Sequence, residues 1–313
     1  MAALIPSTSL GDASSEYLKL FRLLKRLPDA AYVVWQRLSV SDEPTPQFWV
    51  LHQGRRSLLL RVLATTPAEV HAIAHPSLLE LTPRNTSSRQ SLTEIISALA
   101  RSVEQSALAI PLALVFPNLS RTEMDELQLQ LPMGFTASSK EDLHPEKFQS
   151  WLEHNLGEPL NADAIAQLRK TFTSEVVIPP QFTVRAPIAR NTNAQLTEYL
   201  LDYDQEWVLK TELTLNEEAE TAAREFGLYL VNGVAGSGKS LILIYRAHLL
   251  RQLCPHKRIL VLTHNRPLTH DLQWRYQRLR GERVSAEETE WRTFYGWCRA
   301  HWDRRKPWRN PLG

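Results

Sequence analysis

The sequence has few cysteines and no long apolar run. Its 313 residues include only two cysteines, Cys254 and Cys298. Two cysteines cannot form a disulfide framework, and these two lack metal-ligand spacing, so a reducing compartment is the simplest setting. The longest apolar run, residues 107–116, contains Pro111 and has about half the length that a bilayer-spanning helix needs. The first residues also lack a basic segment followed by an apolar stretch, as a signal peptide requires. We therefore expect a cytoplasmic protein with no membrane partner.

The chain has little net charge, because 36 Lys+Arg are balanced by 34 Asp+Glu. This balance hides an asymmetry: residues 251–313 hold 14 Lys+Arg and 6 Asp+Glu, net +8, whereas the other residues hold 22 and 28, net −6. Five of the nine tryptophans also lie in the basic end, at Trp274, Trp291, Trp297, Trp302 and Trp308. Arginines between aromatic rings suit a single-stranded nucleic acid, because cations neutralise phosphates and rings stack on bases. Aromatic residues at helical spacing are more often core residues, however, and arginine runs are often solvated faces, so composition leaves both interpretations open.

Length and periodicity predict two domains of α/β type. In residues 1–173 a helix at 15–27 precedes three short strands and a run of helices. Three prolines and the loss of any steady period mark residues 174–195 as a linker. In residues 196–313 helices and strands alternate, which predicts a parallel sheet. The predicted strands lie at 32–38, 48–52, 57–63, 107–116, 228–232 and 258–263. The predicted helices after the first lie at 91–103, 121–130, 145–154, 161–172, 196–209, 216–226, 240–253 and 268–279.

The most specific motif is residues 233–240, GVAGSGKS, which fits the phosphate-loop pattern G-x-x-x-x-G-K-[ST]. Glycines allow positive φ angles, so that successive backbone N–H groups can face phosphate oxygens. The lysine reaches the β- and γ-phosphates and the hydroxyl after it can ligate Mg²⁺. We therefore expect a nucleoside triphosphate on Gly233, Gly236, Ser237, Gly238, Lys239 and Ser240. Lys239 and Ser240 are the catalytic candidates, and Ser240 is the metal ligand.

Three segments together resemble the first three motifs of UvrD/Rep-type superfamily 1 DNA helicases. They are residues 232–241 around the phosphate loop, residues 259–268 (ILVLTHNRPL) and residues 293–297 (TFYGW), in the family's order and spacing. The resemblance implies a RecA-like domain with ATP and Mg²⁺ as cofactors and single-stranded DNA as partner. In that family a glutamine upstream of the loop reads adenine, and Gln205 stands at this place. Without the resemblance, Gln205 would be read as an ordinary surface residue of a helix.

The resemblance also implies contacts with DNA. The second motif of the family touches single-stranded DNA, which assigns this role to Thr263 and Asn265 and makes Arg266 a phosphate partner. In the third motif Thr293 matches the family, whereas Tyr295 and Gly296 depart from the usual Thr-Phe-His-Ser. For each of these residues a local structural role, at a strand end or in a turn, is the alternative.

A complete helicase motor needs an acidic Walker B pair, an arginine finger and a second RecA-like domain. None of the six acids after Ser240 follows a strand-like apolar run. We therefore expect the chain to be the N-terminal part of a larger helicase, with little turnover unless the missing C-terminal part or a protein partner is supplied. The alternative is a nucleotide-gated binding or regulatory module that is not an enzyme, in which the acidic N-terminal domain meets a protein.

Residues 1–173 resemble, more faintly, the nuclease-related domain that precedes such motors in some bacterial proteins. That domain belongs to the restriction-endonuclease-like folds, which hold a metal with an acid near one core strand and Glu-x-Lys on the next. Here Gln47 stands in place of the acid, and Arg61 and Leu63 replace Glu-x-Lys. Since these residues cannot supply two carboxylates to a divalent ion, we expect a degenerate domain without nuclease activity; an unrelated α/β domain is the alternative. No G-x-S-x-G motif occurs.

Overall fold

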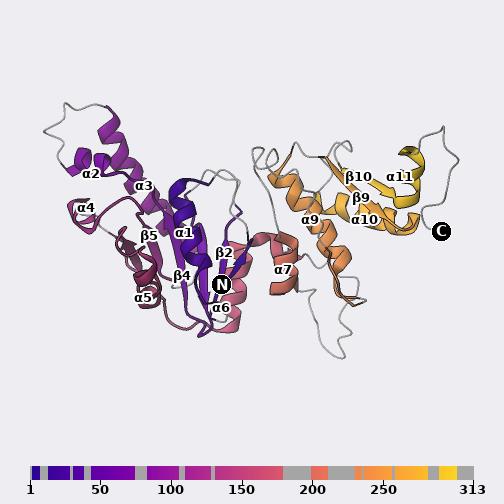
Figure 1. Ribbon diagram of the computed structural model, residues 1–313, viewed down its shortest axis with the longest axis horizontal. Helices are drawn as coiled ribbons and strands as arrows, with labels where there is room; N and C mark the ends of the chain where they lie inside the picture. The colour runs from indigo at the N-terminus through magenta and orange to yellow at the C-terminus, as the bar shows by residue number, and fades with distance from the viewer. Residues whose placement is uncertain are drawn as a thin grey trace. The chain divides into compact units, whose positions relative to one another are not determined.

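The chain divides into two compact units, which are described separately (Figure 1). The first unit comprises Met1–Val177 and Thr211–Ala222, and the second comprises Ile178–Lys210 and Ala223–Gly313. Both contain helices and strands, so the expectation of an α/β protein is confirmed. The computed structural model describes residues 2–7, 13–28, 31–38, 44–74, 83–105, 110–127, 131–178, 199–210, 230–234, 236–255, 258–280 and 289–301. Within these ranges no helix has the length and apolar character needed to cross a membrane.

The first unit is built on a six-stranded sheet whose strand order follows the sequence. The neighbours β2–β3 and β3–β4 are antiparallel, and the other three neighbouring pairs are parallel. The strands are β1 (Ala3–Ile5), β2 (Tyr32–Gln36), β3 (Phe48–His52), β4 (Ser57–Val62), β5 (Leu112–Val115) and β6 (Phe135–Ser138). The helices are α1 (Ser15–Lys25), α2 (Pro67–Ala74), α3 (Pro83–Gln105), α4 (Arg121–Leu127), α5 (Pro145–Asn155), α6 (Ala162–Phe172) and the 3₁₀ turn η1 (Ser174–Val176).

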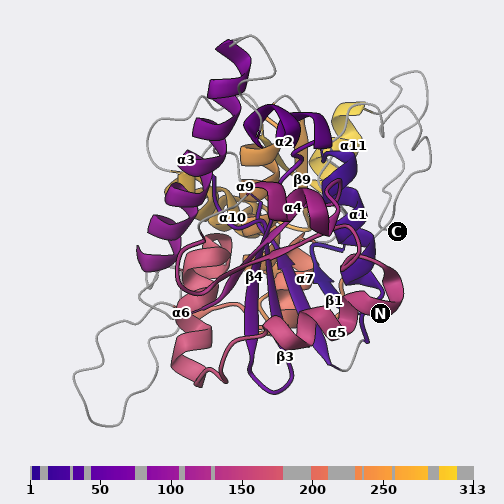
Figure 2. The same ribbon diagram turned by 90° about the vertical axis from the view of Figure 1, so that its left-hand side faces the viewer.

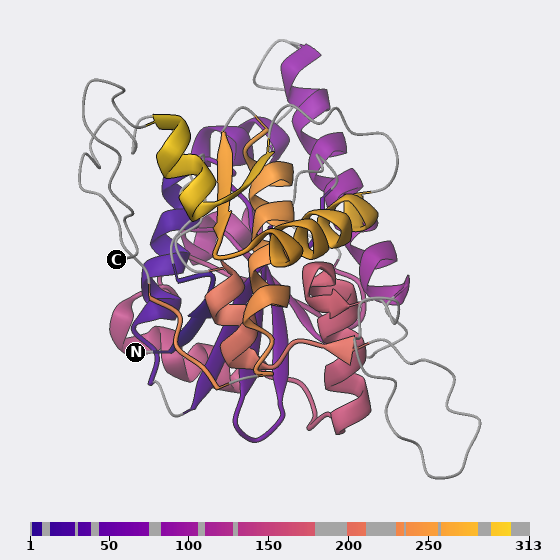
Figure 3. The ribbon, with the colours of Figure 1, turned by 90° about the vertical axis from the view of Figure 1, so that its right-hand side faces the viewer.

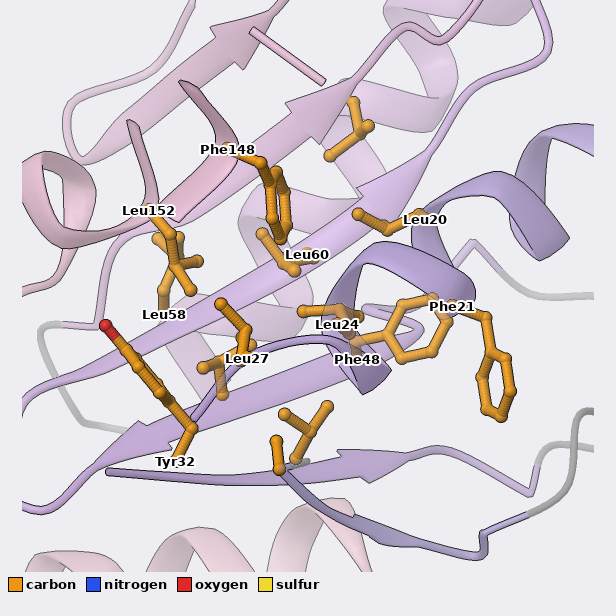
Figure 4. Close-up of a cluster of buried hydrophobic side chains, with 14 of the residues drawn as sticks. Leu20, Phe21, Leu24, Leu27, Tyr32, Phe48, Leu58, Leu60, Phe148 and Leu152 are labelled. Atoms are coloured by element: carbon orange, nitrogen blue, oxygen red, sulfur yellow. The ribbon is translucent and has the colours of Figure 1, made fainter. Parts of the chain in front are cut away.

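Helices cover both faces of this sheet (Figure 2), which explains why its strands are apolar at nearly every position. On one face α1 and α5 supply Leu20, Leu24 and Phe148 to a core that includes Phe48 and Leu60 (Figure 4). On the other face, side chains of α3 and α6 pack on the alternate strand positions. There the rings of Trp35 and Trp49, opposite each other on β2 and β3, stack with centroids 4.3 Å apart. The sheet is therefore the middle of three layers.

The second unit has a smaller set of elements in its described residues. Strands β9 (Ile259–Thr263) and β10 (Thr289–Thr293) form a parallel pair, and β7 (Val177–Ile178), at the division between the units, pairs with β8 (Tyr199–Leu200). The helices are α7 (Tyr203–Lys210), α9 (Lys239–Leu253), α10 (Arg266–Arg280) and α11 (Phe294–His301) (Figure 3). Ile244 and Ala247 of α9 pack against Leu272 and Tyr276 of α10, with Trp291 of β10 beside them.

Two predictions for this unit were wrong in their details. The helix predicted at 196–209 begins only at Tyr203, because Asp202 caps it, and β8 precedes it. The strand predicted at 228–232 is irregular where it is described, and Leu230 is 82% exposed. Among the described residues no strand pairs with this segment, and an unpaired apolar segment has no ladder to hold it extended. The predicted helix at 216–226 and most of the predicted linker, residues 179–195, lie outside the described ranges.

Candidate nucleotide and nucleic-acid site

The phosphate-loop motif leads directly into α9, which begins at Lys239. Gly236 and Gly238 have φ angles of +83° and +81°, in the left-handed region that side chains disfavour. Gly238 is the N-cap residue of α9, and no side chain of the described residues caps this helix. Its first backbone N–H groups therefore point toward the loop without a side-chain acceptor, which is the usual arrangement at an anion-binding helix N-terminus. Ala235, inside the motif, lies outside the described ranges.

The Lys239 ammonium group lies within the loop. Its Nζ donates hydrogen bonds to the carbonyl oxygens of Gly233 at 2.6 Å and Val234 at 2.7 Å, and to Ser237 Oγ at 3.3 Å. A Cβ on Gly233 would come within 2.6 Å of the same Ser237 Oγ, so the loop is tightly closed around the lysine. Lys239 is nevertheless exposed, and its charge is available to an incoming anion.

The residues of the loop also fit a nucleotide-bound Mg²⁺. Ser240 is exposed in the first turn of α9, where its hydroxyl offers one hard oxygen ligand. No group of three or more His, Cys, Asp or Glu in the described parts of the chain could hold a metal ion. Since Mg²⁺ commonly combines one or two protein oxygens with substrate phosphates and water, Ser240 would share such an ion with the nucleotide itself.

Gln205 lies next to the phosphate loop, although 31 residues separate it from Ser237 in the sequence. Its Nε2 donates to the Ser237 carbonyl oxygen at 3.4 Å, and a Cβ on Gly238 would lie 3.4 Å from the same nitrogen. At its other end, Gln205 Oε1 accepts from Asp202 N at 3.1 Å, while Gln205 N donates to Asp202 Oδ1 at 2.8 Å. This reciprocal pair is a capping box at the start of α7. The amide keeps one further N–H and one further lone pair, which are the groups needed to pair with an adenine edge.

Two interactions that sequence reasoning missed fix α7 in place. Arg246 of α9 donates from Nη1 to the carbonyl oxygens of Val208 at 3.2 Å and Leu209 at 2.9 Å, at the C-terminal end of α7. Within α7 Lys210 Nζ and Glu206 Oε1 form a fully buried ion pair at 2.8 Å. The spacing of Glu206 and Lys210, four residues apart, is a signal that could have indicated this pair. Because the same helix carries Gln205, the Arg246 hydrogen bonds also tie the backbone of Gln205 to α9.

The second and third motifs meet at one end of the β9–β10 pair. Thr263 and Thr293 are the last residues of their strands and are register partners. Ligands of parallel α/β sheets bind at this carboxyl end. The Thr263 side chain is buried, and its Oγ1 lies 2.5 Å from Thr269 Oγ1 and 3.1 Å from the Asn265 carbonyl oxygen. Thr263 therefore holds the turn together rather than presenting its hydroxyl to solvent.

The other predicted DNA contacts are also part of local caps. Asn265 Oδ1 accepts from Leu268 N at 2.9 Å, which caps the start of α10. Thr293 Oγ1 accepts from Gly296 N at 3.1 Å and does the same for α11. Arg266, the first residue of α10, is exposed. The four residues are thus brought to one edge, with Arg266 as the exposed cation among them.

Burial shifts the pKa values of two side chains on α9. Desolvation lowers the pKa of His248, and the positive charge of Arg280 on α10 lowers it further. Desolvation also raises the pKa of the Tyr245 hydroxyl. Both shifts favour the neutral form of the side chain, so neither group adds charge to the contact between the helices near neutral pH.

In the first unit, the positions expected to carry a nuclease metal site hold other contacts. Gln47 Oε1 accepts from Val62 N at 2.8 Å, and Arg61 Nη1 donates to the Thr45 carbonyl oxygen at 2.9 Å. Burial lowers the pKa of the Arg61 guanidinium, and Leu63 lies in the core. An amide and a partly desolvated cation therefore occupy the place where paired carboxylates would bind a divalent ion.

Comparison with known proteins gives one family. The sequence model described as UvrD/REP helicase N-terminal domain matches residues 215–309. No curated protein and no solved structure matches the chain. The matched segment contains the phosphate loop and both motifs at the β9–β10 edge, and it supports a UvrD-like helicase part in this region. Gln205 and the whole first unit through Val177 lie outside it.

Proposed function

We propose that residues 196–313 form the ATP-binding part of a superfamily 1 DNA helicase, which binds ATP with Mg²⁺ and single-stranded DNA. The observation that carries the proposal is the contact between Gln205 Nε2 and the Ser237 carbonyl oxygen at 3.4 Å. A glutamine that could read a base and a loop that could hold phosphates come from distant parts of the sequence and lie side by side. The helicase family match over residues 215–309 supports the same function independently of Gln205.

Six residues of the loop have a role in this proposal. Gly233, Gly236 and Gly238 let the backbone approach the phosphates, and the N–H groups at the start of α9 donate to phosphate oxygens. The Ser237 N–H, which donates to the Val234 carbonyl oxygen at 3.2 Å, exchanges this partner for a phosphate oxygen. Lys239 exchanges its loop carbonyl partners for the β- and γ-phosphates, which offer it full negative charge instead of dipoles. Ser240 ligates Mg²⁺, whose contribution is to neutralise the triphosphate.

The DNA strand would lie along the carboxyl end of β9 and β10. Arg266 supplies a cation for a phosphate. Asn265 and Thr293 cap the helices on either side of this edge, so they can set the positions of α10 and α11 and still offer their remaining lone pairs to DNA. Thr263 acts through the turn that it holds together, because its hydroxyl is buried.

For residues 1–173 we infer a nuclease-related fold that has lost its metal site, followed by a linker at residues 174–195, whose first residues form η1 and β7. The order α1-β2-β3-β4-α2-α3-β5, with antiparallel β2–β3 and β3–β4 pairs and a parallel β4–β5 pair, agrees with a restriction-endonuclease-like core. Gln47 and Arg61 are bound to the backbone at the end of the sheet where carboxylates would be needed. The unit would then serve in binding and not in cleavage.

Calorimetric titration of ATP and Mg²⁺ into the full chain tests the nucleotide site. Wild type is expected to bind, and Lys239→Ala to lose binding. Gln205→Glu is the matched variant for base recognition, because it keeps an acceptor for Asp202 N and removes the Nε2 donor. It should reduce the preference for ATP over GTP by about tenfold, the equivalent of one hydrogen bond, while leaving the circular dichroism spectrum unchanged.

The same titrations repeated with a single-stranded oligonucleotide test the coupling to DNA. Tighter ATP binding in the presence of the oligonucleotide supports a helicase part, since linkage between two ligands is reciprocal. If the oligonucleotide does not change the affinity for ATP, the result would favour the alternative, a nucleotide-gated binding or regulatory module. A folded wild-type chain that binds no nucleotide would refute the assignment of the loop.

A further inference from the structure

Helix α10 presents a row of exposed side chains at intervals of four residues. The row consists of Arg266, His270, Trp274 and Arg278, all of which are exposed. Residues four apart lie on the same side of a helix. The opposite side of α10 is buried, where Leu272 and Tyr276 pack against α9. The row is therefore the outer face of α10, and we call these four residues the α10 row.

Trp274 is the centre of the α10 row, and 54% of its surface is exposed. The guanidinium carbon of Arg278 lies 5.0 Å from the centroid of its ring, within the range of a cation–π contact. Trp291, in contrast, is partly buried and packs against the core, with its ring centroid 5.3 Å from that of Tyr276. Trp291 thus agrees with the core interpretation, whereas Trp274 has the exposure that base stacking requires.

The positive charge of α10 is complementary to a polyanion. The helix contains four arginines, at 266, 275, 278 and 280, and one acid, Asp271. Asp271 forms an ion pair with Arg275 at 3.0 Å. Arg275 lies off the α10 row and is half-buried. The two arginines of the row, Arg266 and Arg278, therefore keep an outward-facing positive charge on either side of the indole ring.

We propose that the outer face of α10 is a second binding segment for single-stranded DNA, which continues from the β9–β10 edge along Arg266, His270, Trp274 and Arg278. The proposal rests on the DNA-binding function proposed above. Arg266 belongs both to that edge and to the α10 row, which makes the two surfaces continuous. Arg278 lies twelve positions after Arg266, so the row is about 18 Å long. Trp274 stacks on a base, while Arg266 and Arg278 bind phosphates on either side of it.

Fluorescence anisotropy with oligothymidylates of about 6 and 20 nucleotides tests this proposal on the full chain. Trp274→Leu should weaken binding of the long strand by about tenfold, since loss of one stacked base has an effect of this size. Trp274→Phe keeps an aromatic ring and should recover most of the lost affinity. An abasic strand of the same length should not distinguish wild type from Trp274→Leu, because it offers no base to stack.

Arg278→Gln is expected to weaken binding and to reduce the slope of log K against log salt by about one. Arg275→Gln is the matched control on the same helix; its side chain pairs with Asp271 off the α10 row, and it should bind as wild type does. Wild-type affinity of Trp274→Leu for the long strand would overturn the α10 proposal and leave binding at the β9–β10 edge intact. No binding of either strand by the folded wild type would overturn both the α10 proposal and the proposed DNA partner.

Discussion

Thr263 and Thr293 are register partners at the carboxyl ends of the parallel strands β9 and β10. Thirty residues apart in the sequence, they bring the second and third helicase-like motifs to one edge. Their hydroxyl groups make different hydrogen bonds at this edge. Thr263 Oγ1 is buried against Thr269 Oγ1, whereas Thr293 Oγ1 accepts from Gly296 N at the start of α11. The edge is therefore shaped by side-chain caps before any ligand arrives.

Replacing the buried hydroxyl of Thr263 should destabilise the second unit. Thr263→Val has the same shape but leaves Thr269 Oγ1 without one partner, so we expect the free energy of unfolding to fall by about 1–3 kcal/mol. Urea denaturation followed by circular dichroism measures the change. Thr263→Ser keeps the hydroxyl, so its free energy of unfolding should fall by less than that of Thr263→Val. Equal stability of Thr263→Val and wild type would show that the hydroxyl has no structural role.

The buried pair Glu206–Lys210 should be far more sensitive to the loss of one partner than to the loss of both. Both side chains are fully buried, so Lys210→Met removes the buried cation beside the Glu206 carboxylate and should lower the free energy of unfolding by about 3–5 kcal/mol. The double variant Glu206→Leu with Lys210→Met removes both charges and should recover most of this loss. A double-mutant cycle, measured by urea denaturation, gives the coupling free energy between Glu206 and Lys210. Additive effects of the two single variants would contradict a direct interaction.

Arg246 should stabilise α7 and, through it, the position of Gln205. Arg246→Leu removes the donor to the Val208 and Leu209 carbonyl oxygens, for which we expect a loss of about 1–3 kcal/mol in the free energy of unfolding. Weaker ATP binding should accompany it, because Gln205 lies on the same helix. Arg275→Gln, which breaks an ion pair close to the surface, is the comparison and should change stability by less than about 1 kcal/mol. If Arg246→Leu is destabilised but binds ATP with unchanged affinity, the position of α7 does not affect the nucleotide site.

Much of the first unit follows from its sequence. The strands at 32–38, 48–52 and 57–63 were predicted because short apolar runs are separated by turn residues, and the helices at 15–27, 145–154 and 161–172 because their apolar residues recur at helical spacing; all six are present. Strands β1 and β6 were missed. They have three and four residues, too few to show a period, and their place in the sheet depends on partners distant in the sequence.

The site could be predicted in its residue types but not in its contacts. The loop motif named Lys239 as a phosphate ligand, yet no sequence pattern shows that its ammonium group is held by the loop carbonyls. Likewise, Gln205 was assigned by resemblance, and its capping box with Asp202 depends on where α7 begins, which periodicity misplaced. The arginine–tryptophan composition left a nucleic-acid and a core interpretation open, and only side-chain exposure separates Trp274 from Trp291, which packs against the core.

His248 should make the stability of the second unit depend on pH below neutrality. Desolvation and Arg280 lower its pKa in the folded protein below the unfolded value of about 6.5. The unfolded chain therefore takes up a proton near pH 6.5, while the folded chain resists it. The contribution is fully present above pH 6.5 and is lost as the pH falls toward the lower folded pKa, with a slope of at most about 1.4 kcal/mol per pH unit.

His248→Gln cannot be protonated in this range, so its stability should change less than that of wild type between pH 7.5 and 5.5. Urea denaturation at the two pH values measures the difference for each protein. His264→Gln, at an exposed histidine in the turn before α10, is the control and should follow wild type. The carboxylates whose pKa values are lowered, Glu16, Glu141 and Glu153, titrate below this window and do not interfere. The same loss of stability in wild type and His248→Gln would mean that another group causes it, and that the contact between α9 and α10 does not oppose protonation of His248.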